Sequence, residues 1–190
     1  MEEVKPDWLW QPVPNGFLIG KYEVTHEEYQ VLIPEHQYPP EWARQPVTNL
    51  TEEEIQKFLE ALSRVYPQLD IGLPTEKEWE YAAKGSGRNR YTWGSEFEKN
   101  KANVGTQKLM EVGLFPQSES WCGVSDLIGN VAEVCEIDTK TYTLKTEHHL
   151  VARGGSYQSD ARDSRTTFRH FLWTPKRDDI GFRIVVRPKK

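Results

Sequence analysis

The residues best suited to chemistry lie after position 150 of this 190-residue chain. Arginines and aspartates alternate there: Arg153, Arg162, Arg165, Arg169, Arg177 and Arg183, with Asp160, Asp163, Asp178 and Asp179. A basic cluster could bind a nucleic-acid backbone, but the interleaved carboxylates and a net charge of −5 favour internal ion pairs. We therefore expect Arg153, Arg165 and Arg183 to hold loops in place, and we expect no nucleic-acid ligand.

Metal, thiol and hydrolase chemistry have weaker support. The two cysteines, Cys122 and Cys135, stand outside any CxxC or Cys/His pattern, so we expect two reduced thiols rather than a disulfide or a zinc site. His148 and His149 adjoin Glu147, but no third histidine lies at ligand spacing, so we interpret them as a solvated loop pair. The sequence contains no Gly-rich phosphate loop and no GxSxG or HExxH motif.

The most unusual stretch is the bulky run His170-Phe171-Leu172-Trp173, which a Thr174-Pro175 turn follows. Neither helical nor strand periodicity would bury all four side chains, and a loop cannot bury them without leaving backbone groups unpaired. Two interpretations remain open. Either the aromatic side chains form a recognition surface, or Phe171 and Trp173 fill the core under the loop.

Three helices must help to position these residues, and each begins with the same signature. A threonine stands three residues before a glutamate at Thr25/Glu28, Thr51/Glu54 and Thr75/Glu78, which predicts a capping box at each helix start. In the second helix, Ile55, Phe58, Leu59 and Leu62 fall on one face, while Glu53, Lys57, Glu60 and Arg64 face water. We expect that helix to end at Pro67 and the third to end at Gly85.

After residue 90 the sequence predicts short strands between long polar loops. The strand-like runs are YTWG (91–94), MEVGLF (110–115), VARGGSY (151–157) and GFRIVV (181–186). Residues 1–16 are interpreted as an extended N-terminal arm that leads to a strand at 17–24. Because no βαβ alternation occurs, we predict one α+β domain over residues 1–190, with few helices, a small, mostly antiparallel sheet and long irregular loops.

Composition limits the class of protein further. Seven tryptophans, eight tyrosines and seven phenylalanines can build a core, which argues against disorder. No apolar stretch approaches the length of a membrane span, and the acidic start MEEVKPDW lacks the features of a secretory signal. These features predict a soluble cytoplasmic product, and they leave open its incorporation into a virion or surface assembly.

The segment LPTEKEWEYAA (73–83) resembles the formylglycine-generating-enzyme and sulfatase-modifying-factor family. The resemblance extends over nearly the whole chain through IGKYEVTHEEY (19–29), PVTNLTEEEIQKFLEAL (46–62), YTWG (91–94), KANVG (101–105), a segment containing GNVAE (112–136) and a closing segment with GFR near its end (151–186). It implies that family's variant of the C-type-lectin-like fold. A fold alone does not settle function, which has to be argued from the site.

The site departs from that of the family's enzyme. The resemblance implies that the copper-binding oxidase carries two cysteines, five residues apart, after its GGS(Y/W) turn, and these positions hold Ser159 and Ser164 here. A hydroxyl binds soft Cu(I) poorly and cannot form a mixed disulfide, and Cys122 and Cys135 belong to another segment. We therefore expect no catalytic residue, no cofactor and no oxidase activity.

The resemblance also suggests a structural calcium ion, because Asn103, Asn130 and Glu133 match positions that help to hold calcium in some relatives. The loops here lack clustered aspartates, and the short loop at 105–112 deletes part of one such site. We therefore expect no metal, and we expect Asn130 and Glu133 to satisfy buried backbone groups.

A second resemblance is to the variable proteins of diversity-generating retroelements, whose last segment also runs from a GGS(W/Y) turn to GFR. It implies that residues 151–186 form a variable, ligand-binding segment for a protein or other macromolecular ligand. The candidate binding residues are Tyr157, Gln158, Ser159, Asp160, Arg162, Asp163, His170, Phe171, Leu172, Trp173, Lys176 and Asp178. We interpret the chain as a non-catalytic ligand-binding protein; the alternatives are a divergent enzyme of the family and an accessory protein-interaction domain.

Overall fold

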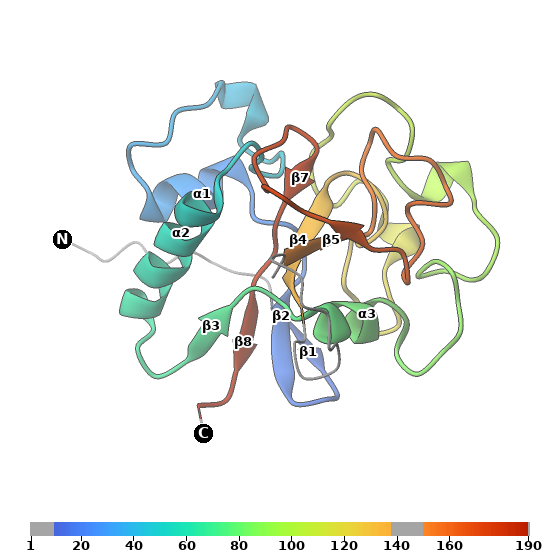
Figure 1. Ribbon diagram of the computed structural model, residues 1–190, viewed down its shortest axis with the longest axis horizontal. Helices are drawn as coiled ribbons and strands as arrows, with labels where there is room; N and C mark the ends of the chain where they lie inside the picture. Colours follow the sequence, from blue (N-terminus) through green and yellow to red (C-terminus); the bar gives the residue numbers. More distant parts are fainter. Residues whose placement is uncertain (1–9, 138–149, 190) are drawn as a thin grey trace.

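The computed structural model describes residues 10–137 and 150–189 (Figure 1). Within them, three α-helices lie in the first half of the chain: α1 (His26–Leu32), α2 (Glu52–Val65) and α3 (Glu76–Lys84). Short 3-10 helices interrupt the loops at Pro40–Trp42, Lys99–Lys101 and Pro116–Ser118. Few helices and small sheets joined by long loops confirm the α+β class.

Two four-stranded sheets form the centre of the described structure. The first has the order β1-β2-β8-β3, with β1 (Trp10–Val13), β2 (Phe17–Gly20), β8 (Val185–Arg187) and β3 (Asp70–Gly72). The second has the order β6-β5-β4-β7, with β6 (His170–Phe171), β5 (Leu150–Arg153), β4 (Ala132–Glu136) and β7 (Ile180–Gly181). Among these strands only β4 and β7 pair in parallel, so the predicted antiparallel character holds for the other pairs.

The strand predictions hold in part near the ends of the chain and are wrong in its middle. The predicted strands at 17–24 and 151–157 end at Gly20 and Arg153, and the run 181–186 is divided between β7 and β8, which belong to different sheets. Residues 91–94 form a turn, in which Tyr91 and Gly94 exchange backbone hydrogen bonds of 2.8 and 3.2 Å. Residues 110–115 form no strand, and the Gly113 N–H instead donates to Asp126 Oδ2 at 2.6 Å. Part of the predicted arm is β1, an edge strand that pairs with β2, and the rest of the arm up to residue 9 lies outside the described residues.

Each α-helix begins with the predicted capping box. Thr25, Thr51 and Thr75 accept the N–H of the glutamate three residues on, and the carboxylate of that glutamate accepts the threonine N–H. The buried face of α2 is the predicted one, namely Ile55, Phe58, Leu59 and Leu62. Helix α2 ends at Val65, just before Pro67, and α3 ends at Lys84, with Gly85 as its C-cap, whose φ of +59° favours glycine.

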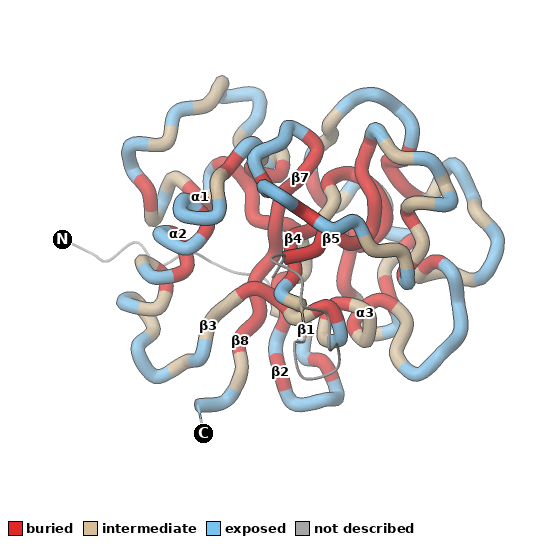
Figure 2. Tube along the Cα trace, in the orientation of Figure 1, coloured by how far each residue is buried: buried red, intermediate tan, exposed pale blue. Residues whose placement is uncertain are grey.

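The buried residues form two main hydrophobic cores, and the second sheet contributes to both (Figure 2). Val134 and Ala152 belong to the core that contains Phe58 of α2, whereas Cys135 and Val151 belong to the core that contains Trp79 of α3. Successive residues of a strand point to opposite faces of the sheet, so β4 and β5 divide their side chains between the two cores. This burial on both faces holds the second sheet in place.

A buried ion pair joins the two sheets to the loops around them. The Arg183 guanidinium donates to both carboxylate oxygens of Glu133 at 2.6 and 2.7 Å, and both residues are fully buried. It also donates to the carbonyls of Gly20, Lys21 and Ser125 at 2.8, 3.0 and 3.0 Å. Burial acts to lower the pKa of Arg183, but the charge and hydrogen bonds of Glu133, together with the nearby charges of Glu23 and Asp126, outweigh it and raise that pKa, so the guanidinium stays charged.

The other two arginines with predicted structural roles differ from each other. Arg153 is buried and donates to Glu80 Oε2 at 2.6 Å and to the Thr166 carbonyl at 2.7 Å, so its predicted role is confirmed, as is that of Arg183. Arg165 is half-buried and forms no ion pair with another described residue, so its predicted pairing is not found there.

A second buried carboxylate lies near the central pair. Glu23 is 1 % exposed, and neither carboxylate oxygen has a hydrogen-bond partner among the described residues. Burial, together with the negative charge of Asp126, raises the pKa of Glu23 well above its usual range despite the nearby charge of Arg183. The folded protein therefore binds a proton at Glu23 more tightly than the unfolded chain does. At a pH where Glu23 is ionised in the unfolded chain, this residue lowers the stability of the folded state.

Replacing Arg183 by alanine should cost about 3–5 kcal/mol of unfolding free energy, because the change leaves Glu133 buried and unpaired. The measurement is urea unfolding at pH 7. Lys176→Ala, at an exposed position, is the control and should change the free energy by less than about 0.5 kcal/mol. A loss below about 1 kcal/mol for Arg183→Ala would contradict the role given to this ion pair.

Glu23→Gln should stabilise the protein at pH 8 and lose this advantage as the pH falls toward 4.5, the usual value for the group. At a pH above the raised pKa, the folded wild-type protein holds a buried negative charge on Glu23. Below pH 4.5, Glu23 carries a proton in both the folded and the unfolded wild-type chain, so this cost is absent. Each pKa unit of the shift corresponds to about 1.4 kcal/mol at high pH. Urea unfolding of both proteins between pH 4.5 and 8 tests this, and a difference that does not vary with pH would contradict it.

Candidate ligand-binding site

The C-terminal segment leaves β5 through a turn that requires two glycines. Gly154 and Gly155 have φ angles of +86° and +71°, which favour glycine. A Cβ atom at Gly154 would lie 2.5 Å from the Leu127 carbonyl oxygen, and one at Gly155 would meet Ser164 Oγ. The turn therefore packs the start of the segment directly against its own middle.

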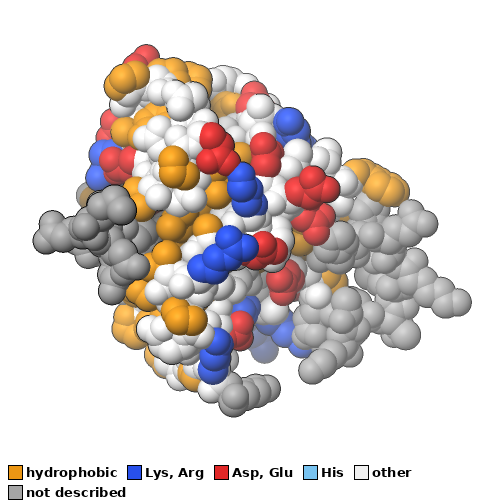
Figure 3. All heavy atoms as spheres, turned by 90° about the vertical axis from the view of Figure 1, so that its left-hand side faces the viewer, with side chains coloured by type: hydrophobic (Ala, Val, Ile, Leu, Met, Phe, Trp, Pro, Cys, Tyr) orange, Lys and Arg blue, Asp and Glu red, His pale blue; other side chains and the backbone are white. Residues whose placement is uncertain are grey.

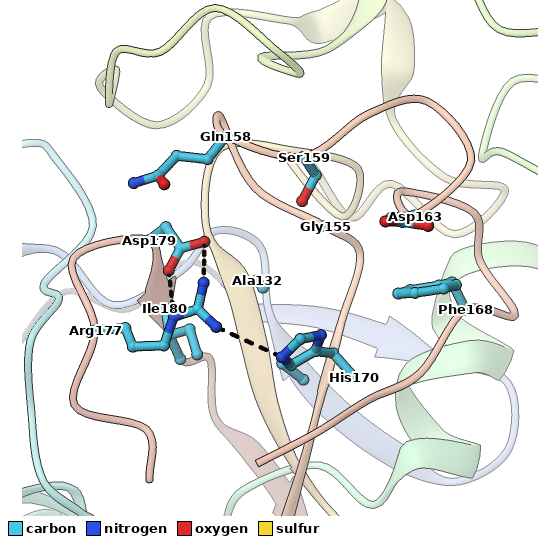
Figure 4. A pocket seen from close by; sticks show the side chains of 11 residues that line it. Ala132, Gly155, Gln158, Ser159, Asp163, Phe168, His170, Arg177, Asp179 and Ile180 are labelled. Carbon is cyan, nitrogen blue, oxygen red and sulfur yellow. Dashed lines mark hydrogen bonds and ion pairs between the residues drawn. The ribbon is translucent and has the colours of Figure 1, made fainter. Parts of the chain in front are cut away.

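Beyond this turn lies a cavity of about 250 Å³ (Figure 4). All four strands of the second sheet supply lining residues: Ala132 from β4, Ala152 from β5, His170 from β6 and Ile180 from β7. The remaining lining residues are Gly155, Gln158, Ser159, Asp163, Phe168, Arg177 and Asp179. The cavity is smaller than usual small-molecule pockets of about 300–1,000 Å³, so it suits one side chain of a larger ligand.

Arg177 and Asp179 form the charged part of the cavity lining (Figure 4). The Arg177 guanidinium donates to the two Asp179 carboxylate oxygens at 2.9 and 3.1 Å, and Ser156 Oγ donates to Asp179 Oδ2 at 3.0 Å. Arg177 Nη1 also lies 3.5 Å from His170 Nε2. Asp179 is buried and Arg177 is exposed, so the pair neutralises a buried carboxylate while its cationic partner remains accessible to a ligand.

Four of the predicted binding residues line this cavity: Gln158, Ser159, Asp163 and His170. Two more lie beside them, because Gln158 Nε2 donates to Tyr157 Oη at 3.0 Å and to Asp178 Oδ1 at 3.2 Å. Tyr157 is largely buried, and this burial raises the pKa of its phenol. The structure thus brings half of the predicted set together around one opening.

Other predicted residues lie outside the cavity lining. Asp160 Oδ1 accepts the backbone N–H groups of Arg162 and Asp163 at 2.8 and 2.9 Å, so Asp160 shapes a turn. The Arg162 and Lys176 side chains are exposed to solvent.

The bulky stretch is an edge strand and its continuation, and Leu172 is the one buried position among its four residues. His170 and Phe171 form β6 and pair with Ala152 and Val151 of β5. Phe171 is 44 % exposed and Trp173 is 83 % exposed, so these aromatic rings do not fill the core. Leu172 is 5 % exposed and belongs to the core around Phe58, so the prediction that it contacts a ligand is wrong.

The two serines at the enzyme's cysteine positions are used by the local structure. Ser159 Oγ accepts the Ser156 N–H at 2.9 Å, and Ser164 Oγ, which is buried, donates to the Asp160 carbonyl at 2.8 Å. Hydroxyl groups are poor ligands for copper, so the residues present do not fit that metal. Both cysteines are free and lie on other elements, and burial raises the pKa of Cys135 well above its usual range.

The three side chains at possible calcium positions also have protein partners. Asn103 Nδ2 donates to Asn130 Oδ1 and to the Lys108 carbonyl, both at 2.9 Å, and Asn130 Nδ2 donates to the Met110 carbonyl at 3.2 Å. Glu133 accepts from Arg183 and, at 2.8 Å, from Trp79 Nε1. Amide and guanidinium donors directed at these oxygens do not fit a calcium ion.

The amide contacts confirm that Asn130 satisfies backbone groups, whereas Glu133 pairs with side chains instead. Within residues 10–137 and 150–189, no three His, Cys, Asp or Glu residues form a group that could hold a metal ion. The predicted solvated pair His148–His149, with Glu147, lies outside the described residues.

Three of the lining residues that the predicted binding set omitted carry large or charged side chains, namely Phe168, Arg177 and Asp179. Phe168 lies outside β6, and its N–H donates to the Arg165 carbonyl in a turn, so strand periodicity gives no signal for it. From the sequence, Arg177 and Asp179 indicated only an internal ion pair. No feature of the neighbouring sequence shows that this pair faces a cavity.

Comparison with known proteins agrees with the motifs and the fold. The family described as "Sulfatase-modifying factor enzyme 1-like domain" matches residues 11–188. The chain belongs to this family. The curated relatives include the mouse protein named "Inactive C-alpha-formylglycine-generating enzyme 2", which is 32 % identical over 142 residues, covering 62 % of this chain and 44 % of that protein.

Another relative is "Hercynine oxygenase" of Mycobacterium tuberculosis. It is 45 % identical over 69 residues, which cover 32 % of this chain and 16 % of that protein. The chain therefore spans less than half the length of these two relatives. Its structure is similar to that of "Treponema denticola variable protein 1", with a TM-score of 0.74 and 25 % identity over 90 % of this chain and 84 % of the other. This similarity supports the C-type-lectin-like architecture. No helix among the described residues has the length and apolar character needed to cross a membrane.

Phe171→Ala and Trp173→Ala should each cost less than about 1 kcal/mol of unfolding free energy, because both rings are exposed. Leu172→Ala, between them, should cost about 2–5 kcal/mol because it removes core packing. Urea unfolding under one condition compares the three variants, with Trp79→Ala as the fully buried control, for which we expect a loss of about 3–5 kcal/mol. Losses above about 3 kcal/mol for both Phe171 and Trp173 would place these rings in the core.

Proposed function

We propose that this protein is a non-catalytic ligand-binding protein whose C-terminal segment, residues 151–186, presents a recognition surface for a protein or another macromolecule. The observation that carries the proposal is the separation of two kinds of position within the segment. Ser164, Thr166, Pro175 and Asp179 are buried, whereas other positions of the segment, among them Gln158, His170 and Trp173, carry exposed polar and aromatic side chains.

This separation matters because a recognition surface has to change its side chains without losing its backbone. The glycine turn and the Arg183–Glu133 pair hold the two ends of the segment. The exposed positions Gln158, Arg162, His170, Phe171, Trp173 and Lys176 lie between those ends. Most exposed substitutions change stability by less than about 0.5 kcal/mol, so many side-chain combinations are compatible with one fold.

The same segment supports the proposed relation to variable proteins of diversity-generating retroelements. The structural similarity to Treponema denticola variable protein 1 covers 90 % of this chain. Exposed aromatic rings such as Phe171 and Trp173 supply large contact areas at low entropic cost. A cavity that suits a single side chain, in the same segment as these rings, fits a macromolecular ligand better than a free metabolite.

An enzymatic function of the family is the second candidate, supported by the similarity to hercynine oxygenase over a third of the chain. At the cavity, however, Ser159 is bound into a turn, and the charges of Arg177 and Asp179 are paired with each other. This arrangement lacks a free nucleophile next to a base, which nucleophilic catalysis requires. We therefore favour binding without catalysis.

The proposal predicts that the exposed positions tolerate randomisation and yield binders. A yeast-display library varied at Gln158, Arg162, His170, Trp173, Lys176 and Asp178 should be selected against hen egg-white lysozyme as an arbitrary protein target. A control library varied at six exposed positions elsewhere, Ser86, Arg88, Arg90, Ser95, Glu96 and Lys99, should be selected in parallel. We expect at least ten times more binding clones from the C-terminal library, with folding retained in both.

Equal yields from the two libraries, or general loss of folding in the C-terminal library, would contradict the proposal. Copper-dependent oxidation of a cysteine-containing sulfatase peptide by the purified protein would contradict its non-catalytic part. Sequencing of the flanking DNA tests diversification separately. A second copy of the 3′ coding segment that differs at adenines, beside a reverse-transcriptase gene, is the expected finding.

A further inference from the structure

A second concave surface lies between the C-terminal segment and helix α2. Its volume is about 840 Å³, and Trp173, Thr174 and Pro175 form one side of it. The other side is the outer face of α2, from Thr51 to Glu60. We call this surface the α2 groove. Figure 3 looks onto the side of the molecule that carries α1 and α2, where acidic side chains lie beside hydrophobic ones.

The charge of the α2 groove is negative. Three carboxylates line it, those of Glu52, Glu53 and Glu60, against one ammonium group, that of Lys57. The Lys57 ammonium group pairs with Glu35, a residue outside the groove lining. Arg64 approaches Glu60 only to 3.9 Å, and both side chains are more than half exposed, so this pair is weak.

The aromatic side of the groove also favours a positively charged ligand. Trp173 is 83 % exposed, which is the largest exposure among the exposed large hydrophobic side chains of the described residues. The face of an indole ring attracts a cation, and tryptophan is the best of the aromatic residues in this role. The carboxylates and the ring face therefore favour a positive charge together.

The spacing of the acidic residues limits the length of the ligand that contacts them. Glu53 and Glu60 are seven residues apart on one stripe of α2, and a helix rises about 1.5 Å per residue. The stripe is therefore about 10 Å long, which equals about three residues of extended chain. A short extended segment could contact both carboxylates and Trp173 at once.

We propose that the α2 groove binds a short basic segment of a protein partner, with an arginine or lysine side chain over the Trp173 ring and further positive charge against Glu53 and Glu60. The inference rests on the proposed function, because Trp173 belongs to the C-terminal recognition segment. It extends the binding surface to α2, which lies outside that segment, and it gives the ligand a charge.

The experiment uses the full chain and a fluorescein-labelled peptide of alternating arginine and serine, nine residues long, with a glutamate–serine peptide as the charge-reversed probe. Fluorescence anisotropy at 150 mM salt measures the dissociation constant. We expect saturable binding of the basic peptide alone. Glu53→Gln/Glu60→Gln should weaken it at least tenfold, Trp173→Ala at least fivefold, and Trp173→Phe less than threefold because the ring face is kept.

A matched control separates a groove from general attraction to an acidic protein. Glu96→Gln/Glu98→Gln removes the same charge from exposed positions elsewhere and should change the dissociation constant less than twofold. Equal weakening by both glutamate pairs, unchanged binding by Trp173→Ala, or absence of saturable binding would overturn the α2 groove as a site. The proposed function has its own test in the display libraries, so success there with failure here would overturn this inference alone.

Discussion

The buried pair of Arg183 and Glu133 is the interaction on which the rest of this structure depends. Arg183 lies between β7 of the second sheet and β8 of the first, and Glu133 lies on β4. The same guanidinium binds the carbonyl groups of Gly20, Lys21 and Ser125, which belong to the end of β2 and to two loops. Without it, these buried acceptors would lose a charged partner, and leaving buried acceptors unpaired is costly. The arginine of the GFR motif is therefore a requirement of the scaffold rather than of its ligand.

Local information explains which parts of the fold the sequence predicts. The three capping boxes and the buried face of α2 follow from residues three and four apart, so they can be identified without the tertiary structure. Strand β4 is different, because its buried acidic residue, Glu133, is stabilised by a partner 50 residues away. Residues 91–94 resemble a strand in composition, yet the turn between Tyr91 and Gly94 satisfies their backbone groups locally.

The candidate site, too, can be predicted from the sequence only where local patterns determine it. The sequence places the candidate binding residues between positions 157 and 178, and six of the eleven residues that line the cavity come from this range. The glycine turn before it has a local signature. The sequence does not distinguish the buried Leu172 from the exposed Phe171 and Trp173, because that distinction requires knowing that β6 pairs with β5. It also gives no reason to associate Trp173 with α2, which is more than 100 residues earlier in the chain.

Strand β6 lies at an edge of the second sheet and is two residues long. A free sheet edge can template pairing with another chain, and apolar side chains on it increase that hazard. In this protein the strand ends before Pro175, which has no N–H to donate. The brevity of the edge therefore limits intermolecular strand addition even where bulky residues occupy it. The protection from aggregation at this edge therefore comes from the backbone, independently of which side chains the strand carries.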